Sequence, residues 1–415
     1  MAGKWHLGVL VVFMFSLLVF GPSFRTSADA LDSWQLVTTS PYGPIYSIAY
    51  GNGVFVAVSD NANYISSSIQ GGISVSSDGI NWNHTETYYS FYQVLFAGGI
   101  FVANGEDFDS GTGYLYASTN GTNWSDSDYY DEPLNGVAYG DGLYVAVGYD
   151  YDDGEYPDSG TSYTSTNGLN WTYHATGTTN FLTGVAYGNG IFLAVGGPNS
   201  AFANPTNAII LKSVNGTNWT TIPNSFGMIL SGVTYVNGRF YATQTVYHYP
   251  NPSTYYVYSS TNGSTWTQVV TPQPNIFIPT SPSTLSNGIY VAVNTNGSVQ
   301  TSPDTTNWTS RITGITNDLY AIAIGPGNLI AGGEGGAIFR SGSTLPSLSG
   351  IQQTGSGGFE LTLAGGTGPA YRIEGSADLI HWSSLGTITN IEAAPQFLDL
   401  SASNYSSRFY RAVWP

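Results

Sequence analysis

The sequence predicts an all-β protein, with a seven-bladed β-propeller of four-stranded blades followed by a small β-sandwich domain. Three observations support this prediction. A stretch of the form Ser-x-Asn/Asp-Gly-x-x-Trp recurs, as in "STNGTNW" at residues 118–124. A hairpin pattern recurs between the copies, and the tryptophans follow one another at intervals of 42 to 48 residues. Four-stranded repeats of this period are typical of propellers.

The hairpin pattern defines the first two strands of each repeat. Clear copies read "YSIAYGNGVFVAVSD" (46–60), "LNGVAYGDGLYVAVGYD" (134–150) and "LTGVAYGNGIFLAVGGP" (182–198). Each is an apolar strand, an Asn-Gly or Asp-Gly turn and an alternating second strand, which is the signature of a tight hairpin. Further copies lie at 92–107, 230–245 and 320–336. A third strand then runs into the "STNG" stretch, and a fourth begins at the tryptophan.

Counting the repeats predicts how the ring closes. The last repeat, at about 319–343, has three strands and no tryptophan, whereas the chain opens with a lone Trp-led strand at 34–38. Pairing that strand with the last repeat gives seven complete blades over residues 31–343. The tryptophans that mark the repeats are Trp34, Trp82, Trp124, Trp171, Trp219, Trp266 and Trp308.

The recurring Trp stretch is interpreted as scaffold. Its Ser and Asn/Asp side chains can accept hydrogen bonds from turn N–H groups, and its Gly adopts the positive φ that the turn requires. The Trp ring is expected to be buried between neighbouring blades. Because nearly every blade carries the same stretch, function is expected where the blades differ.

The same stretch resembles the Asp-box of the sialidase-like propeller superfamily, which includes sialidases, xyloglucanases and photosystem II assembly factors. The family pattern is Ser-x-Asp-x-Gly-x-x-Trp, and the stretch in this chain is one residue shorter. The resemblance covers about residues 32–344. It implies a propeller architecture rather than one particular activity.

The two ends of the chain predict further segments. An apolar run from Leu7 to Phe20, followed by "ADA" at 28–30, predicts a signal peptide over residues 1–30 and therefore a secreted protein. No later apolar run is long enough to span a membrane. Residues 344–415 predict the β-sandwich, and they resemble the fibronectin-type C-terminal modules of large secreted bacterial proteins, especially from the Verrucomicrobia. Its "SADLIHW" again places an Asp before a Trp-led strand, and a spacing or adhesion role is expected.

Composition limits the partners. The chain has no cysteine, and residues 31–415 carry 7 Lys and Arg against 25 Asp and Glu. Such a chain repels nucleic acid, anionic membranes and polyanionic polysaccharides. Neutral glycans, cations and other proteins remain as partners, no organic cofactor signature is present, and a monomer is expected.

Acidic loops distinguish the second and third repeats. Thirteen of the 25 carboxylates lie between Glu106 and Asp158, and no Lys or Arg occurs from residue 26 to 211. Solvated loops, carboxyls of raised pKa and a bound cation remain open as interpretations. Clustered oxygen ligands suit Ca²⁺. The candidate metal ligands are Asp150, Asp152, Asp153, Glu155 and Asp158.

Tyrosines accompany these loops. In the predicted strand order, the Asn-Gly hairpins and the "STNG" turns share one face of the ring, here called the hairpin face. The connections between second and third strands and between blades share the other, here called the loop face. Isolated histidines are expected on loops of three blades, at His84, His174 and His248. The candidate ligand-binding residues on the loop face are Tyr88, Tyr89, Tyr129, Tyr130, Tyr151, Tyr156, Tyr247 and His248.

Two functions fit these patterns. The resemblance itself disfavours a sialidase, because that activity needs three arginines and the propeller has only Arg239, Arg311 and Arg340, the first of them on the hairpin face. We expect a secreted, non-enzymatic propeller that binds a glycan or a cell-surface partner through its loop face. The alternative is a glycoside hydrolase with two carboxylates across a cleft. Its candidate carboxylates are Glu106, Asp107, Asp109, Asp126, Asp128 and Asp131, and no catalytic residue is assigned.

Overall fold

The computed structural model is built almost entirely of antiparallel β-strands. In the part of the chain that it describes, the two helices are the short 3-10 helices η1 (Glu334–Gly336) and η2 (Ala402–Asn404), and no helix is long and apolar enough to span a membrane. The structure describes residues 31–60, 71–107, 110, 112–126, 133–150, 159–198, 208–224, 226–227, 229–248, 251–269, 283–284, 289–311, 313–343, 347–355, 357–364, 370–389, 395–405 and 407–413.

Seven four-stranded sheets, here called blades one to seven, can be counted among the described residues. Blade one contains β2 (Ile45–Gly51), β3 (Val54–Asp60), β4 (Gly71–Ser76) and β5 (Asn83–Thr87). Blade two contains β6 (Ser90–Ala97), β7 (Ile100–Asp107), β8 (Thr112–Ser118) and β9 (Ser125–Asp126). Blade three contains β10 (Leu134–Gly140), β11 (Leu143–Asp150), β12 (Ser159–Ser165) and β13 (Thr172–Ala175). Blade four contains β14 (Phe181–Gly188), β15 (Ile191–Gly197), β16 (Ile209–Ser213) and β17 (Thr220–Thr221).

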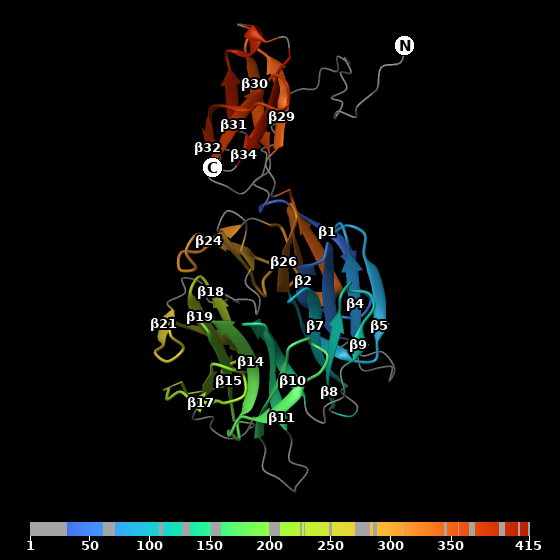
Figure 1. Cartoon of the computed structure of the whole chain (residues 1–415), viewed down its shortest axis with the longest axis vertical. Coiled ribbons are helices and arrows are strands. Elements are labelled where there is room, and N and C mark those ends of the chain that lie inside the picture. Colours follow the sequence, from blue (N-terminus) through green and yellow to red (C-terminus); the bar gives the residue numbers. More distant parts are fainter. Residues whose placement is uncertain are drawn as a thin grey trace.

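The remaining blades complete the ring that Figure 1 shows. Blade five contains β18 (Gly232–Val236), β19 (Arg239–His248), β20 (Asn251–Ser260) and β21 (Thr267–Val269). Blade six contains β22 (Ser283–Thr284), β23 (Tyr290–Val293), β24 (Val299–Ser302) and β25 (Thr309–Arg311). Blade seven contains β26 (Leu319–Gly325), β27 (Asn328–Gly333), β28 (Ala337–Ser341) and β1 (Trp34–Thr39). The β-propeller fold expected from the repeats is therefore confirmed.

The two ends of the propeller sequence meet in blade seven. Strand β1 pairs antiparallel with β28, in a register that runs from Trp34↔Ser341 to Thr39↔Ala337. The N–H of Gly342 also donates to the carbonyl of Ser33 at 2.6 Å. The predicted pairing of the first strand with the last repeat is present, and it gives blade seven its outer strand.

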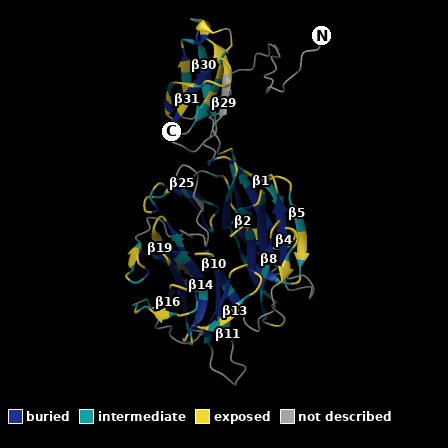
Figure 2. Cartoon of the chain, viewed as in Figure 1, coloured by how far each residue is buried: buried dark blue, intermediate teal, exposed yellow. Residues whose placement is uncertain are grey.

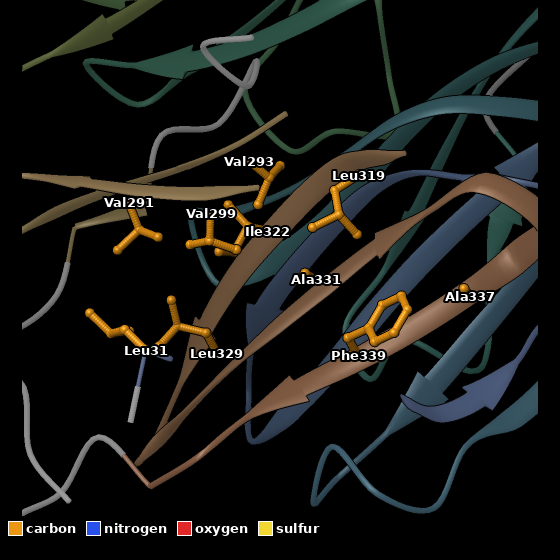
Figure 3. Close-up of a cluster of buried hydrophobic side chains, with 10 residues drawn as sticks. All are labelled: Leu31, Val291, Val293, Val299, Leu319, Ile322, Leu329, Ala331, Ala337 and Phe339. Carbon is orange, nitrogen blue, oxygen red and sulfur yellow. The ribbon is translucent and has the colours of Figure 1, made fainter. Parts of the chain in front are cut away.

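Apolar side chains between neighbouring blades form the core. Figure 2 shows that many residues in the strands of the ring are buried. Val56 and Val58 of blade one pack with Phe91 and Phe101 of blade two, and similar clusters join each further pair around the ring. Figure 3 shows the cluster that blade six and blade seven share with Leu31. Its members are Leu31, Val291, Val293, Val299, Leu319, Ile322, Leu329, Ala331, Ala337 and Phe339.

The hairpin motif also docks one blade on the next. At Gly140 an added Cβ would lie 2.0 Å from the ring of Tyr187 in blade four, so only glycine fits there. Asn52 adopts a φ of 46° in the hairpin turn of blade one, as a type I′ turn requires. Its Nδ2 donates to the carbonyl oxygens of Gly99 at 3.0 Å and Thr119 at 2.8 Å, both in blade two. The Asn-Gly pair therefore contributes to turn geometry and to inter-blade docking.

The Trp stretch forms the expected turn, but its rings are only half-buried. In blade three, Ser165 Oγ accepts from the N–H of Gly168 at 2.8 Å, and Asn167 Oδ1 accepts from that of Asn170 at 2.9 Å. The Trp171 indole donates to the carbonyl of Gly168 at 3.0 Å and packs against the core that blades two and three share. The rings therefore pack between neighbouring blades as predicted but are only partly buried, because each lies at the margin of the inter-blade core.

The C-terminal strands form two three-stranded sheets. One contains β29 (Ser347–Gln353), β30 (Phe359–Ala364) and β33 (Gln396–Asp399). The other contains β31 (Ala370–Ser376), β32 (Ser383–Thr389) and β34 (Phe409–Val413). Leu361 and Leu363 of the first sheet share one buried core with Tyr371 and Ile373 of the second. This C-terminal domain lies at one end of the molecule, outside the ring (Figure 1).

Deleting residues 31–40 should strongly lower the melting temperature. The deletion removes β1, the fully buried Leu31 and the half-buried Trp34, and it exposes the edge of β28. Thermal unfolding followed by circular dichroism measures the effect. A truncated chain that melts like the intact one would show that this strand does not close the ring.

Candidate functional site

A groove of about 310 Å³ lies between blade one and blade two, along the outer strand β5. Ile73 and Val75 of β4 line it together with Phe91 of β6, and all three belong to the buried core between the two blades. It extends from Trp124, in the turn at the hairpin face, to Tyr88 and Tyr89, in the connection between the blades. The groove therefore reaches the loop face at two of the predicted ligand-binding tyrosines.

Local structure fixes the positions of these two tyrosines. Strand β5 ends at Thr87, whose Oγ1 donates to the carbonyl of Tyr89 at 2.7 Å and tightens the short connection to β6. The Tyr88 ring is left 70% exposed. The Tyr89 ring stacks on Tyr114 at 4.0 Å between centroids and lies 5.9 Å from Tyr116. The Tyr89 ring from the connection between the blades and the Tyr114 and Tyr116 rings from β8 thus form one aromatic platform, with the exposed Tyr88 next to Tyr89 in the chain.

The groove is lined mostly by apolar and aromatic groups, and no Lys or Arg is among the described residues that line it. Desolvation, followed by the hydrogen bond with Tyr89, raises the pKa of Tyr114 to about 12, so this phenol is neutral at physiological pH. Hydroxyl and amide groups of Asn83, Thr85 and Thr122 line the remainder of the groove, with Glu86 as its one carboxylate among the described residues. Flat rings with hydroxyl and amide groups around them suit the faces and edges of an uncharged sugar.

A second group of side chains lies where the inner strands begin, on the loop face. Bulges interrupt these strands at equivalent positions, between Ile45 and Ser47 in blade one and between Phe91 and Gln93 in blade two. Bulges of this kind redirect side chains and are frequent near functional sites. The bulged residue of blade two is Tyr92, whose hydroxyl donates to Glu106 Oε1 at 2.6 Å.

Buried carboxyls surround this tyrosine. Asp60, at the end of β3, is 8% exposed and accepts a 2.7 Å hydrogen bond from Ser90 Oγ. Burial raises the pKa of Asp60, and burial together with the charge of Asp60 raises that of Glu106. Sequence reasoning selected Glu106 but missed Asp60 and Tyr92. The detectable signal was that Asp60 and Glu106 occupy equivalent positions in the second strands of adjacent repeats.

Most of the remaining predicted site residues lie outside the described residues. Among the candidate metal ligands Asp150 ends β11, whereas Asp152, Asp153, Glu155 and Asp158 fall in a segment that the structure does not describe. No set of three or more His, Cys, Asp or Glu side chains arranged to hold a metal is found among the described residues. The other candidates outside the described residues are Tyr129, Tyr130, Tyr151, Tyr156, Asp109, Asp128 and Asp131.

The structure does not bring the other described candidates into the groove. Asp107 ends β7 and Asp126 ends the short β9 of blade two. Tyr247 and His248 lie at the end of β19 in blade five, where the structure describes the backbone but not the side chains. Of the predicted ligand-binding residues that the structure describes, Tyr88 and Tyr89 are the two that line the groove.

All three predicted loop histidines lie within strands, so that part of the prediction was wrong, and His248 is the last residue of β19. His84 belongs to β5, and its Nδ1 lies 2.7 Å from Ser74 Oγ. His174 belongs to β13, and its Nε2 lies 2.9 Å from Thr164 Oγ1. Burial lowers the pKa of the His84 and His174 rings, so both are neutral at physiological pH. His84 Nε2 also lies 3.4 Å from Thr38 Oγ1 of blade seven. The Trp-led fourth strands continue further than the sequence pattern indicated.

Comparison with known proteins supports the fold class. No protein-family model matches the sequence, and no curated protein does. YCF48 from Cyanidioschyzon merolae is similar over 74% of this chain and 98% of its own, with 16% identity and a TM-score of 0.50. A structure of YCF48 bound to a D1 peptide has 14% identity and a TM-score of 0.51, over 75% of this chain and 97% of its own.

An enzyme shares the same fold. A catalytically inactive virginiamycin B lyase from Staphylococcus aureus, solved with quinupristin, has 13% identity and a TM-score of 0.52, over 74% of this chain and 98% of its own. At these identities the likeness shows the propeller fold alone. Because a fold of this kind supports both binding proteins and enzymes, function has to be argued from the site.

Replacing Glu106 with Gln should raise the free energy of unfolding at pH 7. The pKa of Glu106 is raised in the folded protein, so the folded state is penalised as the pH rises above the ordinary value of 4.5. Glutamine removes that penalty and can still accept the Tyr92 hydrogen bond. The difference from the unmodified protein should disappear below that pH, which denaturant titrations across pH would measure.

Asp78→Asn provides a control of opposite sign. Backbone N–H groups of Asn81 and Ile80 hold the pKa of Asp78 well below its ordinary value of 3.8. Asparagine occupies the equivalent turn position in most blades, so the variant should fold but be less stable at pH 7, with the difference closing in acid. A Glu106→Gln variant that behaves like the Asp78 control would contradict the electrostatic account.

Proposed function

We propose that this protein is a secreted, non-enzymatic propeller that binds a neutral glycan in the groove between blade one and blade two. The observation that carries the proposal is that Tyr89, Tyr116 and the exposed Tyr88 line the groove together with hydroxyl and amide groups. Tyr114 lies outside the lining and stacks on the Tyr89 ring. A sugar ring can stack its C–H face on such a platform while its hydroxyls bond to the polar groups.

The size and charge of the groove support a short uncharged ligand. A volume of about 310 Å³ is near the lower end of the range for ligand sites. Residues 31–343 carry 20 Asp and Glu against 4 Lys and Arg, so an anionic glycan would be repelled. A cell-surface protein is the alternative partner, and the structure of YCF48 with a D1 peptide provides a precedent for a propeller that holds a peptide.

Glycoside hydrolysis is a second candidate, favoured by one observation. A general acid needs a carboxyl of raised pKa, and burial gives Glu106 such a pKa beside Asp60. Tyr92 holds the Glu106 carboxyl in place at 2.6 Å. We rank hydrolysis below binding because the groove that suits a sugar is lined by Glu86 rather than by this pair. Release of new reducing ends from a bound glycan would reverse the ranking.

Calcium is proposed as a stabilising ion of the acidic loop that follows Asp150. If Asp150, Asp152, Asp153, Glu155 and Asp158 bind it in the folded state only, Ca²⁺ at a hundred times its Kd raises stability by about 2.7 kcal/mol. Melting curves with Ca²⁺ and with chelator test this. The double variant Asp152→Asn/Asp153→Asn should melt at the same temperature with Ca²⁺ and with chelator. If the melting temperature of the unmodified chain does not depend on calcium, the calcium proposal is wrong and the carboxylates are simply hydrated.

Replacing Tyr88 with Ala should weaken glycan binding at least about tenfold, or 1.4 kcal/mol, without changing the melting temperature. The side chain is 70% exposed, so its loss removes sugar contacts but little packing. A screen of neutral oligosaccharides, followed by titration calorimetry on the best ligand, provides the measurement.

Tyr173→Ala serves as the matched control. Tyr173 lies on the outer strand β13 of blade three and is 48% exposed, but it is not part of the groove. Its replacement should leave the affinity unchanged. Equal binding by the Tyr88 variant and the unmodified protein would remove the groove from consideration, and binding of charged glycans alone would contradict the electrostatic argument.

A further inference from the structure

Exposed apolar side chains are concentrated on the C-terminal domain rather than on the propeller. Of the 13 large hydrophobic residues that are exposed in the described part of the chain, seven follow residue 347. Five of these seven belong to the loops and strand ends at one end of the two sheets. This group, here called the distal tip, consists of Leu379, Ile380, Leu400, Tyr405 and Phe409.

Strand pairing places the distal tip away from the propeller. Strand β31 ends at Ser376, which pairs with Phe409 at the start of β34, and β33 ends at Asp399, which pairs with Phe359. The turn at 377–382 and the loop at 400–408 therefore emerge at the same end of the domain. Ser347, the first residue of β29 after the propeller, pairs with Ala364 at the opposite end. Figure 2 shows exposed segments at the end remote from the ring.

The turn at the distal tip departs from its propeller counterparts in a way that favours exposure. Leu379 adopts a φ of 64°, where the corresponding residues of blades one and three are Gly79 and Gly168. Its side chain is 55% exposed, and that of Ile380 is 75% exposed. The turn keeps the usual hydrogen bonds from N–H groups to Asp378. Leu379 is thus displayed at a position where glycine would form the same turn with less strain, and the exposed Ile380 follows it.

Amphipathic groups accompany the aliphatic ones. The Arg408 guanidinium sits 4.0 Å from the centroid of the Tyr405 ring, and that of Arg411 sits 4.2 Å from the centroid of the Trp382 ring. Aromatic rings with a polar edge, and arginines whose stems lie along apolar surface, are typical of the boundary between hydrocarbon and water. These groups therefore give the C-terminal domain amphipathic side chains at the same end as its exposed aliphatic ones. The same turn also carries the exposed Asp378 and His381, which pair at 2.7 Å.

We propose that the distal tip inserts into an uncharged lipid surface and holds the propeller away from it. The tip exposes roughly 500 Å², the size of the largest and often functional patches on monomers. Two such tips, or one tip against a protein, would bury roughly 1,000 Å² in total, less than the roughly 1,200–2,000 Å² of a stable protein interface. Lipid needs no matching partner surface, because hydrocarbon surrounds each inserted side chain.

Charge determines which lipid surface fits. Residues 347–413 carry 3 arginines against 5 Asp and Glu, whereas the propeller carries 4 Lys and Arg against 20 Asp and Glu. The described arginines of the domain are paired, Arg408 with Asp399 at 2.9 Å and Arg372 and Arg411 with Glu374 at 2.9 and 2.7 Å. An anionic surface would repel the propeller with no free cation on the tip to compensate. Zwitterionic headgroups avoid that repulsion.

Vesicle flotation of the chain from Leu31 onward tests the proposal. The protein should float with phosphatidylcholine vesicles, and replacing part of that lipid with phosphatidylglycerol should weaken binding at low salt but not at high salt. Leu379→Gly with Ile380→Asn should lower the partition coefficient at least about tenfold. Its melting temperature should stay equal or rise, because glycine suits the φ of 64°.

Ile80→Asn is the matched control. Ile80 follows Gly79 in blade one as Ile380 follows Leu379, and it is 49% exposed. Its replacement should leave flotation unchanged. The proposal is overturned if the unmodified chain does not float with protein-free vesicles. It is also overturned if the Leu379→Gly/Ile380→Asn variant floats to the same extent as the unmodified chain, or if Ile80→Asn lowers the partition coefficient by the same factor as that variant. A tip-dependent dimer in solution without flotation would assign the surface to a second copy instead.

Discussion

Apolar packing between neighbouring blades is the interaction on which the rest of this structure depends. No cysteine is present, so no disulfide holds the ring together. Each blade buries side chains against the blade before it and the blade after it, as Val56 of blade one does against Phe101 of blade two. A sheet packed in this way cannot lose a neighbour without exposing a core. The pairing of β1 with β28 therefore matters far more than its few hydrogen bonds indicate.

The same packing decides where variation is tolerated. Gly140 cannot change because the Tyr187 ring occupies the space of a Cβ, and Asn52 contributes to both its turn and the next blade. Such positions repeat around the ring and carry no individual function. The connections between blades are freer. One such connection supplies Tyr88 and Tyr89 to a groove, whereas Thr176 of the connection after blade three bonds back to Gly160 of its own blade.

The sequence was sufficient for the architecture because the repeat is local and periodic. The hairpins, the turn before each tryptophan and the pairing of residues 34–38 with the last repeat were all predicted correctly. The candidate site was harder, because its parts come from different blades. Tyr114 and Tyr116 lie two residues apart in β8, a spacing that many strands show. Nothing in the sequence predicts that the Tyr89 ring stacks on Tyr114. Asp60 and Tyr92 are likewise joined through Glu106 only in space.

Repetition also provides an internal standard for recognising function. Six turns of the propeller and one of the C-terminal domain share the same hydrogen bonds, so each residue can be compared with its equivalents. Most propeller copies have Gly at the left-handed position, which costs least there. Leu379 keeps the turn at higher conformational cost and exposes its side chain. Leu379 thus departs from the repeated turn at a cost in stability, and its side chain does not fill a core. Contact with a molecule outside the chain explains such a residue better than a role in folding does.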